Sequence, residues 1–167
     1  MCWTVCKSRL CGFAAQKIIH KATTYKLPLY AALANAMKLN STDNEILSFV
    51  ASWVNYLVQE DYESAFSLVK HDPYYQLSPK LLEETINGYG LPEPHPSGEV
   101  YKVTSPETAI GMIGQKLVTR EMVSESCAGY VYYDLPLNGK WSDLTASFRL
   151  EIQKEELSLV LEEIHVF

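Results

Sequence analysis

Three polar side chains in the C-terminal part of the chain are of the types that catalyse proton transfer. They are Asp134, Asp143 and His165, and we expect them on neighbouring strands, where they could converge. A carboxylate beside an imidazole can orient that imidazole as a general base. The sequence favours a structural interpretation instead. Asp143 follows a turn whose backbone amides it could bind, and His165 suits an exposed strand residue or a satisfied core group.

The strand that carries Asp134 is also rich in tyrosine, and a tryptophan follows it. Tyrosine and tryptophan suit interfaces and pocket linings, because one end of each side chain is apolar and the other is polar. We therefore predict that Tyr130, Tyr132 and Trp141 are binding residues, and that Tyr133 faces the core. If the side that carries Tyr130 and Tyr132 is open, it is a binding surface. If the N-terminal segment covers it, it is more core.

The familiar motifs of nucleotide binding and hydrolysis are missing from the sequence. It contains no G-x-S-x-G, phosphate loop, H-E-x-x-H or dinucleotide fingerprint. The cysteines lack the C-x2-C spacing of a structural zinc site, so free thiols in a reducing compartment are expected. The four cysteines are Cys2, Cys6, Cys11 and Cys127. No metal and no cofactor are predicted.

The composition is that of an acidic globular protein. The 167 residues are 47% hydrophobic and 20% charged, with a net charge of −6. A field of this sign repels nucleic acid, and no Lys/Arg run forms a local basic patch. No apolar run approaches the roughly 20 residues of a membrane helix, and no secretory signal peptide is recognisable. We therefore expect a cytoplasmic protein that binds neither nucleic acid nor membranes.

The first 40 residues differ from the rest in charge. They contain lysine and arginine, but no Asp or Glu precedes Asp43. This asymmetry predicts a basic, partly helical N-terminal extension over residues 1–40 and a single α+β domain over residues 41–167. In a second interpretation, Met37 is the natural start and residues 1–36 are upstream translated sequence.

Three helices are predicted after this extension. Thr42 and Glu45 have the spacing of a capping box, and apolar residues then recur at helical spacing for about four turns. A second, shorter helix follows from Tyr62. Ser78-Pro79 begins a third helix, and Gly90 suits its left-handed closing position.

The remainder of the chain indicates strands. Alternating apolar residues on both sides of Asn138-Gly139 predict a β-hairpin over residues 130–148. Other predicted elements are a loop over 91–98, strands over 99–104, 116–123 and 157–167, and a one- or two-turn helix after Ser105-Pro106.

The last strand requires an irregularity if its apolar residues are to share one face. Strict alternation from Leu157 would turn Ile164 and Val166 away from the core. A β-bulge at Glu162-Glu163 would return both side chains to the core side. The sequence therefore predicts a bulge at this pair.

Helices followed by about four antiparallel strands predict an α+β fold, with the N-terminal helices packed on a curved sheet. This order resembles the NTF2-like (cystatin-like) cone architecture over about residues 43–167. The resemblance implies a pocket between the sheet and the helices, in a fold that hosts both enzymes and pure binding modules.

Two shorter runs resemble a small bacterial family of uncharacterised domains. They are Trp141-Ser142-Asp143-Leu144-Thr145 and the ending Leu161-Glu162-Glu163-Ile164-His165-Val166. The resemblance covers about fifteen residues in total and implies no activity, so no functional residue is carried over from it.

Two functions are compatible with the sequence. The preferred one is a non-enzymatic binding or protein-interaction module, dimeric through an open sheet face or acting as an immunity- or accessory-type factor on a larger partner. The acidic charge, the aromatic strand and the absence of catalytic motifs favour it. The alternative is a small-molecule enzyme of the isomerase or dehydratase type, with an Asp/His site in the cone pocket.

Overall fold

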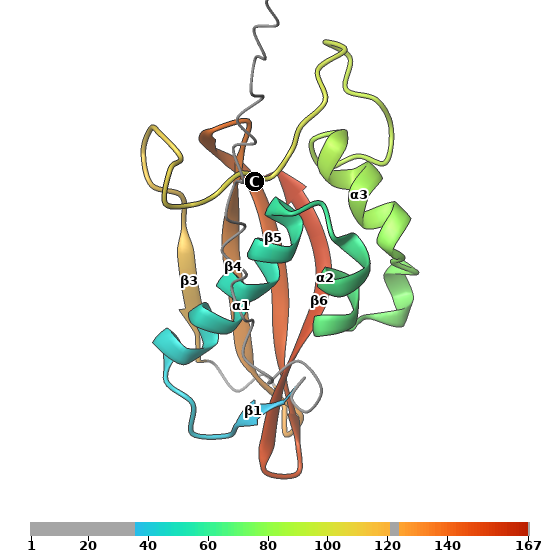
Figure 1. Cartoon of the computed structure of the whole chain (residues 1–167). Coiled ribbons are helices and arrows are strands. Elements are labelled where there is room, and N and C mark those ends of the chain that lie inside the picture. The colour runs from blue at the N-terminus through green and yellow to red at the C-terminus, as the bar shows by residue number, and fades with distance from the viewer. Residues whose placement is uncertain (1–35, 121–123, 167) are drawn as a thin grey trace, which may run out of the picture. The chain divides into compact units, whose positions relative to one another are not determined.

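The structure is a computed structural model that describes residues 36–120 and 124–166, all of which belong to one compact unit. Within these residues, three helices precede the long strands and pack on one face of a strongly curled antiparallel sheet (Figure 1). The helices are α1 (Asp43–Val58), α2 (Tyr62–Leu68) and α3 (Pro79–Asn87), and a 3-10 turn, η1 (Pro73–Tyr75), lies before α3. The α+β prediction is thus confirmed.

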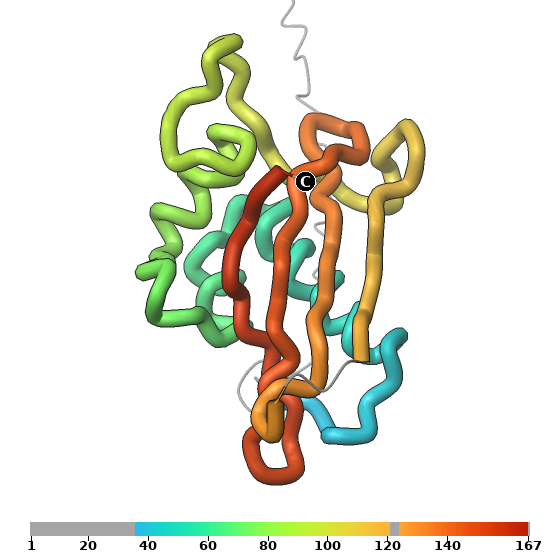
Figure 2. Tube along the Cα trace, turned by 180° about the vertical axis from the view of Figure 1, so that it is seen from behind, coloured from blue at the N-terminus to red at the C-terminus, as the bar shows by residue number. Residues whose placement is uncertain are grey.

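The sheet is a meander that is extended at one edge. The meander comprises β3 (Lys116–Thr119), β4 (Cys127–Leu137), β5 (Lys140–Gln153) and β6 (Glu156–Val166), with antiparallel neighbours throughout. Figure 2 shows these strands from the face that the helices leave uncovered. Two further strands pair with β6, the antiparallel β1 (Met37–Lys38) and the parallel β2 (Lys70–His71).

The described sheet therefore has five to six strands, and the prediction of about four was too low. The additional strands, β1 and β2, contain two residues each. Such short segments have no measurable alternation, so only their pairing with β6 identifies them.

The β4–β5 hairpin and the bulge in β6 follow the sequence closely. Asn138 and Gly139 have φ values of 49° and 82°, the conformation of a type I′ turn. In β6, Leu161 pairs with Phe148 and Glu163 pairs with Ser147, which leaves Glu162 as the extra residue. The predicted bulge is confirmed, and it keeps Ile164 buried, but Val166, which was also expected in the core, is 43% exposed at the end of the strand.

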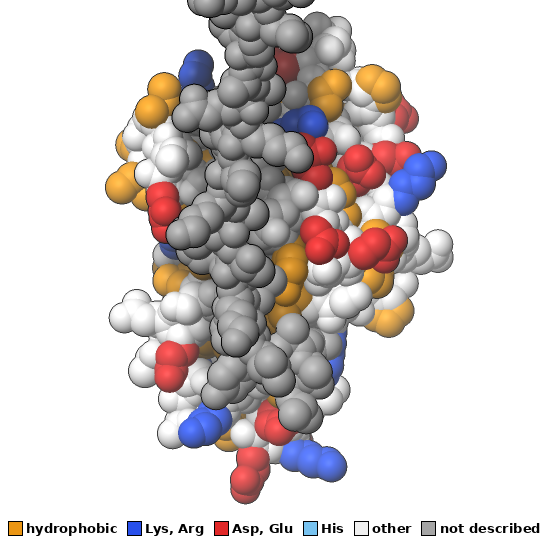
Figure 3. Space-filling model, viewed as in Figure 1, with side chains coloured by type: hydrophobic (Ala, Val, Ile, Leu, Met, Phe, Trp, Pro, Cys, Tyr) orange, Lys and Arg blue, Asp and Glu red, His pale blue; other side chains and the backbone are white. Residues whose placement is uncertain are grey.

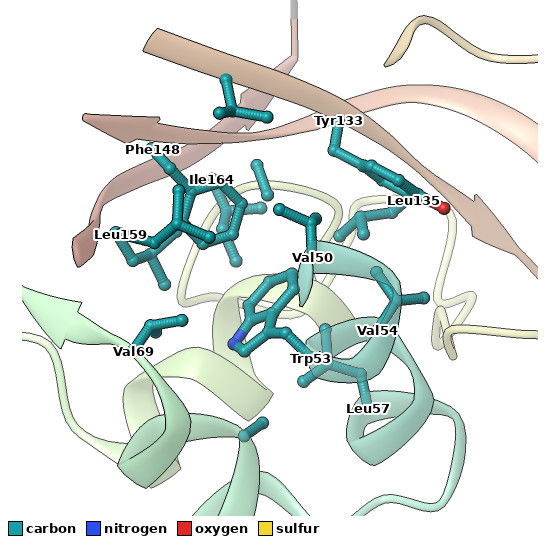
Figure 4. Close-up of a cluster of buried hydrophobic side chains, with 14 of the residues drawn as sticks. Val50, Trp53, Val54, Leu57, Val69, Tyr133, Leu135, Phe148, Leu159 and Ile164 are labelled. Carbon is teal, nitrogen blue, oxygen red and sulfur yellow. The ribbon is translucent and has the colours of Figure 1, made fainter. Parts of the chain in front are cut away.

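Helix α1 supplies one wall of the core. Its predicted capping box is present: the Thr42 amide donates to Glu45 Oε2 at 2.7 Å, and the Glu45 amide donates to Thr42 Oγ1 at 3.3 Å. The apolar face of α1 is fully buried against the sheet (Figure 4). At its centre, the Trp53 ring meets the Phe148 ring edge-on, with centroids 5.1 Å apart.

Two predicted elements of the middle of the chain are absent from the structure. Residues 99–104 form no strand and contribute only an isolated bridge between Val103 and Leu137. After Ser105-Pro106 there is one hydrogen-bonded turn, closed by the Ala109 amide on Ser105 O, and no helix. In the first segment the amides find partners elsewhere in the chain, such as Asn138 Oδ1 for Lys102 and Pro136 O for Thr104, and in the second they bond Ser105, so neither segment leaves these amides unsatisfied.

Most of the predicted N-terminal extension lies outside the described residues. At its end, Met37 and Lys38 pair with Leu157 and Glu156 in the sheet. The extension and the alternative start at Met37 therefore stay predictions. The predicted strand over 116–123 is present for residues 116–119, and residues 121–123 are outside the described part. No helix in the described residues is long and apolar enough to span a membrane.

Candidate functional site

The predicted acid–base residues lie near one end of the sheet. Asp134 pairs with Thr145 across β4 and β5, and Thr145 pairs with His165 across β5 and β6. Asp134 and His165 therefore belong to one row on the face opposite the helices, two strand spacings or roughly 10 Å apart. A threonine separates the two groups that could have formed a carboxylate–imidazole pair.

Both carboxylate oxygens of Asp134 accept hydrogen bonds from the protein. Thr145 Oγ1 donates to Oδ1 at 2.5 Å, and the Gln115 amide donates to Oδ2 at 2.6 Å. The Asp134 amide in turn donates to Gln115 O at 2.9 Å. These bonds hold the segment before β3 against β4, so Asp134 acts as an anchor for that segment.

Asp143 lies outside this row because β5 is irregular where it faces Leu135. Its side chain accepts a hydrogen bond from the Tyr89 hydroxyl, rather than from the turn amides that the sequence suggested. Burial of the phenol, together with the Asp143 carboxylate, raises the pKa of Tyr89 to about 12. Tyr89 is therefore a neutral donor at physiological pH, and Asp143 fixes the end of α3 to the sheet.

His165 has a third environment. Its Nδ1 lies 3.4 Å from Glu163 Oε1, on the same strand. The three predicted catalytic residues thus have three different sets of neighbours: Thr145 and Gln115 for Asp134, Tyr89 for Asp143, and Glu163 for His165. The structure places them on neighbouring strands as predicted, but it does not bring them together into one acid–base centre.

The predicted binding residues Tyr130 and Tyr132 lie on the sheet face opposite the helices. Their rings stack at 6.4 Å with an interplanar angle of 28°. Both side chains are half-buried, whereas Tyr133 is buried on the helix side, as its place in the alternation predicts. On the adjacent β3, Thr119 Oγ1 accepts from the Tyr130 amide at 3.1 Å, so the edge strand is fastened beside these rings.

Trp141, the third predicted binding residue, lines a groove of about 250 Å³ beside the hairpin turn. The groove also has Tyr89 and Tyr101 in its wall, and their ring centroids are 4.6 Å apart. His95 lies edge-on to both tyrosines, at 6.0 Å and 5.3 Å. This aromatic cluster was not predicted, because its only signal in the sequence is three aromatic side chains around a proline-rich loop.

A second groove, of about 280 Å³, lies between the end of α3 and the same proline-rich loop. Its lining includes three carboxylates, from Glu84, Glu93 and Glu99, and it contains no lysine, arginine or histidine. Glu99 lines both grooves, so the region around the loop is acidic.

The loop before β3 exposes a run of large apolar side chains. Ile110, Met112 and Ile113 are 64%, 90% and 75% exposed. Figure 3 shows hydrophobic side chains (orange) at the upper left of the molecule, the side on which Figure 1 draws the loop before β3. The loop is nonetheless well anchored. The Ile110 amide donates to Gly139 O at 2.9 Å, and the Trp141 amide donates to Ile110 O at 3.1 Å.

Arg149 is the centre of an ion-pair network on the sheet face opposite the helices. Its Nε donates to Glu162 Oε1 at 2.8 Å, and Nη2 lies 3.3 Å from Asp72 Oδ2. Nη1 lies 3.6 Å from Glu151, which also pairs with Lys70 at 2.9 Å. The hydrogen bond to Glu162 and the neighbouring carboxylates raise the pKa of Arg149, so it remains charged. Because each of these charges has a partner, the network has a structural role.

The space between α1 and the sheet, where the cone resemblance implied a pocket, is filled. Trp53, Phe148 and the neighbouring aliphatic side chains occupy it with no solvent exposure (Figure 4). No group of three His, Cys, Asp or Glu residues in the described part of the chain could hold a metal ion. In the described part of the chain, the two grooves and the apolar loop are surface features that could contact another molecule.

Comparison with known proteins gives no match. No family model matches the chain, and no curated protein or solved structure matches it significantly.

Proposed function

We propose that this protein is a non-enzymatic protein-interaction module of NTF2-like architecture, and that its contact surface is the apolar loop made by Ile110, Met112 and Ile113. The observation that carries the proposal is the exposure of three neighbouring large apolar side chains, 64–90% each, on an anchored loop. Soluble monomers rarely expose such a contiguous patch unless it binds something.

The composition of the surroundings supports the same function. Methionine and aromatic residues are enriched at protein interfaces, and Trp141 is hydrogen-bonded through its backbone to the loop. Leu117, on the edge strand β3 that follows the loop, is a further large apolar side chain that is 41% exposed. The partner is a protein with a complementary apolar surface, in the simplest case a second copy of this chain.

The enzyme alternative has less support. A small-molecule enzyme of this architecture would work in a pocket between helices and sheet. Trp53 and Phe148 fill that space, and the carboxylates of Asp134 and Asp143 are engaged by Thr145, Gln115 and Tyr89.

The test compares the loop with the surface predicted from the sequence. In one variant Ile110, Met112 and Ile113 are all changed to Ser; in the other, Tyr130→Ser and Tyr132→Ser are combined. We expect the loop variant to lose self-association, measured by sedimentation velocity, or to lose binding of a partner, measured by pull-down. The tyrosine variant should keep the same association. Tyr74→Ser removes an 84% exposed aromatic side chain and is the control.

Loss of association in the tyrosine variant alone would move the interface to the sheet face. Association that survives in the loop variant would refute the loop as the contact surface. Circular dichroism of each variant verifies that the fold is intact, which is expected for the loop because its three side chains lie outside the core.

A further inference from the structure

The groove beside the hairpin turn combines aromatic walls with a carboxylate, Glu99. Tyr89, Tyr101 and Trp141 contribute aromatic rings from three separate segments of the chain. A volume of about 250 Å³ is below the range of drug-sized ligand pockets, so it suits a small head group.

Two carboxylates lie near these rings. Glu99 lines the groove, and its Oε1 accepts from Asn138 Nδ2 at 3.0 Å, which holds the side chain beside the hairpin turn. Asp143 lies behind Tyr89 and accepts its hydroxyl hydrogen bond. Burial and the nearby Glu99 carboxylate raise the pKa of Tyr101, so this ring also stays neutral. The aromatic walls thus have one carboxylate, Glu99, among the lining residues, with Asp143 next to Tyr89 outside the lining.

The chain itself places an ammonium group on one of these rings. Lys116 Nζ lies 4.9 Å from the centre of the Trp141 ring and 5.1 Å from the centre of the Tyr133 ring. An electron-rich ring face attracts a cation in this geometry, and tryptophan does so most strongly. The Trp141 ring therefore attracts cations, but the Lys116 charge already lies over it and opposes a second positive group there.

We infer that the groove lined by Tyr89, Tyr101, Trp141 and Glu99 binds the methylated ammonium head group of a small organic cation, of the choline type. The methyl groups would contact the aromatic rings, and the positive charge would be compensated by Glu99 and, at longer range, by Asp143. A bare ammonium is more strongly hydrated and fits less well, because the aromatic walls cannot replace its hydrogen bonds with water.

Lys140 is the one positive side chain in the groove wall, and it opposes this ligand. It is exposed and forms no ion pair within the described residues. The inference therefore also predicts that removal of this charge strengthens binding.

The probes are choline and its uncharged isostere 3,3-dimethylbutan-1-ol, titrated into the full-length protein and followed by two-dimensional NMR. We expect saturable shifts for the Trp141 indole and the Asn138 side-chain amide with choline, and binding about tenfold weaker for the isostere. Equal affinities for the two probes would overturn the inference, because the groove would then recognise only shape and apolar surface. Absence of saturation with choline at tens of millimolar would overturn it as well.

Four variants locate the site. Glu99→Gln and Trp141→Leu should each weaken choline binding several-fold, and Lys140→Gln should strengthen it. Tyr74→Leu, far from the groove in the sequence and in exposed surroundings, should change nothing. Unchanged choline binding in Glu99→Gln and Trp141→Leu would refute this location. The inference does not depend on the proposed interaction function, since none of the three loop side chains lines the groove.

Discussion

The two faces of strand β5 carry side chains of opposite character. The side chains that point to the helices are Leu144, Ala146, Phe148 and Leu150, all fully buried. Those that alternate with them are Thr145, Ser147, Arg149 and Glu151. Thr145, Arg149 and Glu151 make hydrogen bonds or ion pairs, whereas the buried Ser147 hydroxyl has no hydrogen-bond partner among the described residues. The apolar face depends on packed volume, whereas the polar face depends on each charge having a partner.

This difference shows how the sheet can be covered by helices on one face only. Burial of apolar area stabilises the helix side without directional contacts. On the other side, the Arg149 network half-buries its charged side chains and replaces their hydration with direct contacts. Changes of volume should therefore act mainly on the first face, and changes of charge mainly on the second.

The largest effect is expected from Trp53→Ala. This substitution removes the contact with Phe148 and leaves a cavity at the centre of the core. The free energy of unfolding should fall by about 3–5 kcal/mol. Urea denaturation measures the change. Tyr74→Ala is the matched control, because this aromatic side chain is 84% exposed and its loss should be nearly neutral. Equal losses in the two variants would contradict the assignment of Trp53 to a rigid core.

A smaller effect is expected from Arg149→Met on the opposite face. The substitution leaves Glu162, Asp72 and Glu151 close together without their common cation, and about 2 kcal/mol should be lost. The loss should shrink at high salt, because added ions screen the remaining carboxylates. Urea denaturation at two salt concentrations tests both statements.

Lys80→Met supplies the comparison for this second prediction. Lys80 pairs with Glu84 at 3.2 Å on an exposed helix surface, with 82% of its side chain accessible. Exposed pairs of this kind contribute only about 0.3–0.5 kcal/mol. If Arg149→Met costs no more than Lys80→Met, the network is as weak as an ordinary surface ion pair.

The smallest effect is expected at β2, whose two residues have different surroundings. Lys70 belongs to the polar network, while the next residue, His71, stacks on Phe66 at 3.7 Å and bonds Phe66 O through Nε2 at 2.7 Å. Its Nδ1 is buried and has no hydrogen-bond partner among the described residues. Burial lowers the pKa of His71, so the folded state prefers the neutral ring.

The consequence for stability has a definite sign. The unfolded chain takes up a proton on His71 near pH 6.5 and the folded chain only at lower pH, so stability should fall as the pH drops below about 6.5. In His71→Gln this part of the pH dependence should disappear. Unfolding free energies measured at pH 7.5 and 5.5 for both proteins give the comparison. An unchanged slope in the variant would assign the dependence to other groups.

Local signals in the sequence were sufficient for several parts of this fold. The capping box of Thr42 and Glu45, the proline start of α3 and the Asn138-Gly139 turn each depend on residues within one turn or one hairpin. The bulge in β6 could be predicted because one extra residue in a strand shifts the phase of its apolar alternation, and that shift is visible in the sequence. Elements whose partners are distant, such as β1 and β2, could not be predicted in this way.

The candidate site was only partly predictable for the same reason. The sequence indicated Asp134, Asp143 and His165 on neighbouring strands, but the register that puts Thr145 between Asp134 and His165 depends on the irregular pairing near Leu135. It indicated Trp141 as a binding residue. It could not indicate Tyr89 and Tyr101 beside it, because a proline-rich loop brings them there from outside the sheet.

By itself, the sequence determined the class of fold, the Asn138-Gly139 turn, the N-terminal caps of α1 and α3 and most of the core-facing residues of the hairpin. These features follow from intrinsic preferences and from periodicity over a few residues. Only the tertiary structure decided which polar side chains meet, as in the network of Arg149 with Asp72, 77 residues away. Such contacts depend on strand register and loop closure, and a shift of one residue moves a side chain to the other face of the sheet.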